Sequence, residues 1–237
     1  MMEAIGMDGY KFGGWREAPA HRRENPDGTK GGVVADSATV STTVTLPTSV
    51  EVWPGASIGY GASIGYGASI GYGASIGDGA SIGDRASIGG RASIGDRASI
   101  GAGASIGDGA SIGAGASIGD GASIGAGASI GYRASIGAGA SIGYGASIGA
   151  GAKYVRGDWL FVAGPQGSRR ALATAIYSRS EKILRWWIGC QHGLTTDNLR
   201  ARVEAEYGTT ANGDDYRALI DFVLAHPGLK RAMADHE

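Results

Sequence analysis

The sequence predicts a mainly β protein, in which a parallel β-helix of about seven triangular coils is followed by a small α+β domain. The first observation is a six-residue repeat, Gly-Ala-Ser-Ile-Gly-X, which recurs almost without error from Gly55 to Ala152. The second is that isoleucine falls at strict six-residue intervals, from Ile58 to Ile148. The third is an abrupt change after Tyr154, where alternating apolar and aromatic residues replace the repeat.

Each hexad combines a short straight segment with a corner. In Ala-Ser-Ile, alternation places alanine and isoleucine on the inner face and serine on the outer face. Gly-X-Gly supplies a corner where a side chain would obstruct the turn or where φ is positive. Three hexads make one coil, so isoleucines eighteen residues apart stack in ladders. A fixed period with one large apolar residue per unit therefore predicts an ordered solenoid, not a flexible glycine-rich linker.

The motif Ala-X-Ile-Gly-X-X resembles the hexapeptide-repeat, left-handed parallel β-helix family over about half the chain. The resemblance implies a left-handed β-helix and side-by-side packing of helices as trimers. The family contains many acyltransferases that use acyl-CoA or acyl-carrier-protein donors, with a histidine base on or beside the helix. Acyl transfer from an acyl-CoA donor is therefore one function that the resemblance implies.

The hexad pattern continues beyond its perfect copies and sets the expected boundaries. Counting by sixes from the perfect repeat reaches apolar residues at Val52, Leu46, Val40 and Val34 on one side and Tyr154 on the other. We therefore expect the β-helix to span residues 34–154. Residues 1–33 are either a loosely ordered polar arm or a cap that folds over the first coil through Tyr10, Phe12 and Trp15.

Residues 155–237 predict a small domain of three antiparallel strands and two helices. The strands are expected at residues 159–162, 172–176 and 183–190, and the helices at 198–207 and from 214 or 215 to Pro227. The Gly-Ser-Arg turn and the Gly-Cys-X-X-Gly segment resemble C-terminal modules of uncharacterised bacterial and phage proteins. Trp186 and Trp187 are expected to face opposite sides of the sheet, one in the core and the other covered by a helix or available to a partner.

The residues argue against the enzymatic alternative. The perfect repeat contains no histidine, and the four histidines of the chain stand near its ends, at His21, His192, His226 and His236. Cys190 and His192 are interpreted either as a nucleophilic pair or as a buried cysteine beside a polar cap. Too few ligands stand together for a metal site, so we expect no catalytic residue, no metal and no cofactor.

Several residues are candidates for binding. The turn 164–170 is either a phosphate cradle completed by Ser168, Arg169 and Arg170 or a hairpin turn with solvated arginines. Arg85, Arg91 and Arg97 are expected to pair with corner aspartates, whereas Arg133 lacks an acidic partner and is a candidate for an outside contact. The remaining candidates are aromatic, namely the collar of tyrosines on one coil and one tryptophan: Tyr60, Tyr66, Tyr72 and Trp186.

Composition limits the partners. The chain has 21 basic and 22 acidic residues, so its charge predicts neither nucleic-acid nor membrane binding. A single cysteine and the lack of a long apolar run are typical of a cytoplasmic protein. We therefore expect a non-enzymatic structural or binding protein, a rigid scaffold that presents a C-terminal interaction domain. Its expected partners are copies of itself, as a trimer, and either another protein, in an interaction of phage type, or a nucleotide or other small anion.

Overall fold

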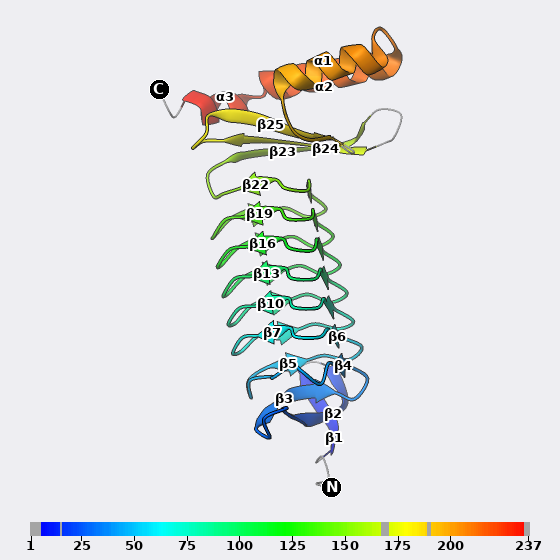
Figure 1. Cartoon of the computed structure of the whole chain (residues 1–237), viewed down its shortest axis with the longest axis vertical. Coiled ribbons are helices and arrows are strands. Elements are labelled where there is room, and N and C mark those ends of the chain that lie inside the picture. Colours follow the sequence, from blue (N-terminus) through cyan, green and yellow to red (C-terminus); the bar gives the residue numbers. More distant parts are fainter. Residues whose placement is uncertain (1–5, 15, 167–170, 189–190, 235–237) are drawn as a thin grey trace.

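The computed structural model of the chain describes residues 6–14, 16–166, 171–188 and 191–234. Three parts are stacked end to end along one axis (Figure 1). An N-terminal hairpin is followed by a rod of coils, and the rod is followed by a small sheet with helices on its far side. The architecture confirms the predicted parallel β-helix of about seven triangular coils followed by a small α+β domain.

The rod has three sides, and each coil contributes a short strand to each side. Strands eighteen residues apart pair in parallel and in register, as in Ser81 with Ser99 and Ile82 with Ile100. The three sheets contain nine, seven and six strands, and the N-terminal hairpin belongs to the largest. The strands of the rod are β3 (Lys30–Ala35), β4 (Thr39–Val40), β5 (Glu51–Val52), the Ser–Ile pairs from β6 (Ser57–Ile58) to β21 (Ser147–Ile148), and β22 (Lys153–Tyr154).

The core of the rod is the stack of isoleucines and alanines that the hexad predicts. Every isoleucine from Ile58 to Ile148 is at most 4% exposed. Most serines between them are exposed, so the inward and outward assignments are confirmed. Full burial of one isoleucine side chain contributes roughly 1.5–3 kcal/mol, and that contribution is repeated at every hexad.

The two glycines of each hexad are required for different structural reasons. The glycine after isoleucine lies against the next coil, and a Cβ on Gly101 would stand only 2.5 Å from the backbone nitrogen of Asp120. The last glycine of the hexad has positive φ, for example +65° at Gly103. Close approach therefore excludes a side chain at the first position, and backbone conformation disfavours one at the second.

The N-terminal residues cover the open end of the first coil. β1 (Gly6–Phe12) and β2 (Arg16–Glu24) form an antiparallel hairpin, and β2 continues into the rod by pairing with β3. Phe12 is fully buried there beside Val33 and Ala35. These strands correspond to the cap and not to a loosely ordered arm, while Trp15 lies outside the described residues.

Polar side chains complete this cap by binding backbone groups that lack a neighbouring coil. The Asn25 side chain accepts a hydrogen bond from the Leu46 N–H at 2.9 Å and donates one to the Leu46 carbonyl at 3.1 Å. The Arg23 guanidinium donates to the Ser41 carbonyl at 2.6 Å, and burial lowers the pKa of this arginine. Unpaired backbone groups are costly to bury, so these contacts replace the missing coil.

The C-terminal sheet closes the other end of the rod. Its four antiparallel strands are β23 (Trp159–Gln166), β24 (Ala171–Ser178), β25 (Ile183–Ile188) and β26 (Gln191–Thr195). One face packs on the last coil through Ile176 and Trp187, and the Trp187 Nε1 donates to the Ala150 carbonyl at 3.2 Å. The other face lies under α1 (Thr196–Tyr207), α2 (Ala211–Ala225) and α3 (Pro227–Ala234).

The sequence prediction missed one strand and one helix of this domain. β26 was hidden because Gly193, with φ of +64°, interrupts the apolar pattern between β25 and α1. α3 was missed because Pro227 was interpreted as the end of α2. Proline is also favoured at the first position of a helix, where its missing N–H costs nothing, and Pro227 begins α3.

Replacing Ile100 with alanine should lower the free energy of unfolding by about 2–4 kcal/mol, because the rigid stack cannot close the cavity. Ser99→Ala, in the same strand but on the outer face, is the matched control and should change it by less than about 0.5 kcal/mol. Chemical denaturation followed by circular dichroism measures both values. Equal effects of the two substitutions would contradict the stacked isoleucine core.

Candidate functional site

The tyrosine collar occupies the three corners of one coil, as its spacing predicts. Tyr60, Tyr66 and Tyr72 are 67%, 59% and 42% exposed, so all three rings reach solvent. Tyr132 and Tyr144 are exposed at later corners. The rod therefore presents aromatic side chains without burying them, and their role in association stays a prediction.

The aspartates at the corners accept hydrogen bonds from backbone N–H groups. Each accepts, through Oδ1, a hydrogen bond from the backbone N–H of the residue eighteen positions earlier, at 2.7–3.0 Å. A carboxylate is a strong acceptor for such a group, because the bond is charge-assisted. These residues are Asp78, Asp84, Asp96, Asp108 and Asp120.

The predicted ion pairs between corner arginines and aspartates do not form within the described part of the chain. The aspartates accept hydrogen bonds from backbone N–H groups, whereas each arginine side chain lies near the glycine eighteen residues earlier. A Cβ on Gly67, for instance, would be 3.5 Å from the Arg85 Cγ. These arginines also have φ between 53° and 57°, a region that costs a non-glycine residue about 1–2 kcal/mol. They are Arg85, Arg91, Arg97 and Arg133.

Two further candidate residues have partners inside the chain. The Arg133 guanidinium lies 4.8 Å from the centre of the Tyr132 ring, so its contact is with its own neighbour, and an outside contact stays a prediction. Trp186 is 1% exposed, and its Nε1 donates to the Thr196 hydroxyl at 3.0 Å. The two tryptophans do face opposite sides of the sheet, but both sides are covered, so Trp186 is a core residue and not a surface for a partner.

Other candidates fall outside what the structure describes. Ser168, Arg169, Arg170 and Cys190 are not among the described residues, so the phosphate cradle and the Cys–His pair stay predictions. His192 lies in β26, without a described side chain. Among the described residues, no group of three or more metal-ligating side chains comes together, and no helix is long and apolar enough to cross a membrane.

One pair of residues with chemical potential emerges where the cap meets the first coil. The His21 Nδ1 lies 2.9 Å from the Asp36 Oδ1, across the junction of β2 and β3. The Asp36 N–H donates to the Pro19 carbonyl at 2.9 Å, which holds the carboxylate beside β2. Their side chains are 36% and 54% exposed, so a substrate can reach the imidazole.

This arrangement suits proton transfer. When the Nδ1–H donates to a carboxylate, the proton stays on Nδ1 and the lone pair of Nε2 is free to accept another. The carboxylate also orients the ring and stabilises the imidazolium that forms. The other histidine with a described side chain, His226, accepts the Gly228 N–H at 3.0 Å through Nδ1, which leaves the proton on Nε2 and no free base.

The sequence carried one usable signal for this pair, and the prediction missed it. His21 and Asp36 are separated by fifteen residues, which becomes a short distance only if residues 16–35 form a hairpin. The turn residues Pro26, Asp27 and Gly28 between β2 and β3 are typical of such a hairpin. The prediction started the β-helix at Val34 and assigned no strand to the preceding residues, whether they form an arm or a cap.

The fold defines the class of protein: a parallel β-solenoid built from hexapeptide repeats. Residues 73–107 match the family model described as bacterial transferase hexapeptide (six repeats). The coils of the rod are thus similar, over the matched residues, to the repeats of the hexapeptide family. The sequence matches none of the curated proteins.

Solved structures are similar to this chain at low sequence identity. A Bacillus cereus protein described as an acetyltransferase is 19% identical, with a TM-score of 0.43, over 80% of this chain and 91% of its own. A hexapeptide transferase family protein of Anaplasma phagocytophilum is 16% identical, with a TM-score of 0.42, over 82% and 93%. With TM-scores below 0.5, these likenesses carry no argument about this chain.

Replacing Arg97 with glycine should raise the free energy of unfolding by about 0.5–1 kcal/mol. Glycine removes the strain of positive φ, and the greater freedom of the unfolded chain offsets part of that gain. Arg97→Ala retains the positive φ and is the matched control, expected to show no gain. Denaturant titrations of the three proteins measure the effect, and a loss of stability in Arg97→Gly would show that the arginine side chain stabilises the corner.

Proposed function

We propose that this protein is an acyltransferase of the hexapeptide-repeat type, with His21 as its general base. The single observation that carries the proposal is the hydrogen bond between the His21 Nδ1 and the Asp36 carboxylate at the first coil. The match of the repeat to a transferase family model supports the same class of reaction. Of the two functions expected from the sequence, this match favours acyl transfer over the non-enzymatic scaffold.

The proposed step is the transfer of an acyl group from a thioester to an amine or a hydroxyl. The His21 Nε2 accepts the proton of the acceptor N–H or O–H while the acceptor atom attacks the thioester carbonyl. The tetrahedral intermediate collapses with loss of the thiolate, which takes the proton back from the imidazolium. Asp36 stabilises the imidazolium between these two proton transfers.

The first test measures thiol release from acetyl-CoA with a panel of amine and hydroxyl acceptors. His21→Gln should lower turnover by roughly 10²–10⁴-fold, which is the usual contribution of a general base. Asp36→Asn should lower turnover by a smaller factor, because the base remains but loses its orientation.

His226→Gln is the matched control, because His226 lies in the C-terminal domain among Trp159, Phe161 and Phe222. It should leave turnover unchanged. Turnover that survives in His21→Gln would overturn the assignment of the base. A wild-type protein that transfers no acyl group to any acceptor would overturn acyl transfer itself.

Two observations favour a second candidate, the rigid scaffold with a C-terminal interaction domain. The hexads from Gly55 to Ala152 contain no insertion and no histidine, so the rod itself offers no base. The C-terminal helices expose apolar side chains, with Phe222 58% and Met233 50% exposed. A contiguous patch of exposed apolar side chains marks a surface that binds a protein, and in this candidate function Phe222 and Met233 would belong to such a patch.

Either function is compatible with side-by-side association as a homotrimer. Light scattering should then give three times the 23.8 kDa of one chain. Changing Tyr60 and Tyr66 to alanine should weaken the association, and the coils should be unaffected because Ala102 and Ala114 occupy the same hexad position. A wild-type monomer, or a double variant with undiminished mass, would contradict a collar that joins the copies.

A further inference from the structure

The turn of the N-terminal hairpin overhangs one side of the rod. The Tyr10 hydroxyl donates to the Glu51 Oε1 at 2.7 Å, and the Gly13 N–H donates to the Oε2 of the same carboxylate at 3.1 Å. Glu51 stands at the outward position of β5, where later strands carry serine. The bond to Glu51 raises the pKa of Tyr10, with burial and the charge of the carboxylate acting in the same direction. The hairpin is therefore fastened to the outer face of this sheet.

A groove of about 840 Å³ lies between this overhang and the next coils. Its volume is that of sites for small molecules, which range over roughly 300–1,000 Å³. Its lining combines two arginines, two aromatic rings, two outward serines and one aspartate, which are Arg16, Arg91, Trp53, Tyr72, Ser69, Ser87 and Asp108. Within the described residues, neither arginine forms an ion pair, so both positive charges are available.

Arg16 is held in place by an aromatic ring. Its guanidinium carbon lies 4.6 Å from the centre of the Tyr72 ring. Tyr72 is 42% exposed, less than the 67% of Tyr60 and the 59% of Tyr66 at the equivalent corners. A cation positioned on a ring loses less conformational freedom when it binds an anion, so this contact prepares the arginine for a ligand.

Gly90 lines the groove without adding a side chain to it. From residue 60 to residue 150, it is the one glycine at the variable corner position. A Cβ there would meet nothing nearer than the Tyr72 carbonyl oxygen at 3.4 Å, so local crowding alone does not exclude a side chain. The Gly90 N–H already donates to the Asp108 Oδ1 at 2.7 Å, which engages the acidic residue of the lining in the corner. The absence of a side chain at residue 90 therefore leaves space beside Arg91.

We propose that this groove binds a small phosphorylated polyol, such as a sugar phosphate. The guanidinium groups of Arg16 and Arg91 would bind the phosphate, because a guanidinium donates two parallel hydrogen bonds to two of its oxygens. Ser69 and Ser87 would bind the hydroxyl groups of the polyol. The proposal does not rest on acyl transfer, because the site consists of residues other than His21 and Asp36.

The test is isothermal titration calorimetry with glucose 6-phosphate at constant ionic strength. Arg91→Gly should raise the Kd about tenfold or more, as expected for the loss of a charge-assisted pair. The substitution installs the residue that most hexads carry at this position, so folding is preserved. Gly90→Tyr should abolish binding by filling the groove, and tyrosine already occupies this position on the same edge at Tyr72 and Tyr144.

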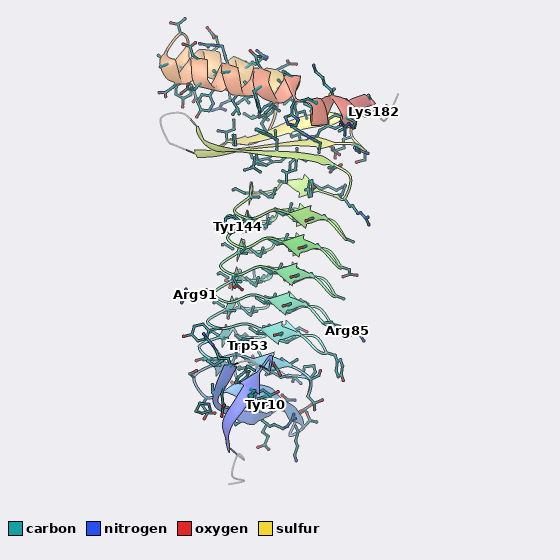
Figure 2. The ribbon with its side chains drawn as sticks, turned by 180° about the vertical axis from the view of Figure 1, so that it is seen from behind. Tyr10, Trp53, Arg85, Arg91, Tyr144 and Lys182 are labelled. Atoms are coloured by element: carbon teal, nitrogen blue, oxygen red, sulfur yellow. The ribbon has the colours of Figure 1, made fainter. Side chains whose placement is uncertain are left out.

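Two matched controls should bind as tightly as the wild type. Arg85→Gly makes the same change one hexad earlier. Arg85 and Arg91 lie on opposite sides of the rod (Figure 2). Ala138→Tyr adds the same ring at a corner away from the groove. If Arg85→Gly and Arg91→Gly raised the Kd equally, the effect would come from the overall charge of the protein, and this result would overturn the site.

Titrations with glucose and with inorganic phosphate test separately the binding of the phosphate by the arginines and of the hydroxyl groups by the serines. Binding of glucose as tight as that of glucose 6-phosphate would overturn the phosphate assignment. Equally tight binding of inorganic phosphate would overturn the role of the serine hydroxyls. A wild-type protein that binds none of the three would overturn the proposal as a whole. Since no thioester is present, these results are independent of the outcome for acyl transfer.

Discussion

Contact between isoleucines eighteen residues apart is the constraint on which the rest of this structure depends. It sets the register of all three sheets, because each isoleucine pairs with the isoleucine of the next coil. The inner volume admits isoleucine and alanine, and the close approach of coils at residues such as Gly101 admits only glycine. Nearly all freedom to vary is thereby confined to the corners, the outward strand positions and the two ends. Any site on this rod must be built there.

The ends carry most of the chemistry because an open solenoid cannot be left uncovered. The cap at the N-terminus buries Phe12 and satisfies the backbone of Leu46, and in doing so it brings His21 to Asp36 and Arg16 to Tyr72. The C-terminal sheet buries Trp187 against the last coil and places the helices on its far side. The requirement at the N-terminal end thus positions His21 and Arg16, the cap residues from which the two proposals are argued.

The period of the repeat was enough to predict the coils and the inward or outward direction of the alanine, serine and isoleucine of each hexad. The period did not predict the hydrogen-bond partners at the corners, because the partner of an aspartate depends on the direction of its side chain. Asp96 binds the backbone N–H of Asp78 instead of pairing with Arg97, and no spacing rule distinguishes these partners. At the ends, Gly193 and Pro227 were interpreted as interruptions, although one lies within a strand and the other begins a helix. The His21–Asp36 pair was missed for a related reason, because it forms only through the hairpin that precedes the repeat.

The two proposed sites share one structural element. Arg16 and His21 both belong to β2, five residues apart, which corresponds to roughly 16 Å along an extended strand. Arg16 reaches across the outer face of one sheet, whereas His21 lies over the first corner, where Asp36 follows β3. Because β2 pairs with β3 and β3 is the first strand of the rod, the isoleucine ladder determines where both side chains stand. The rod can in this way act as the rigid support that positions a base and a cation at a fixed separation.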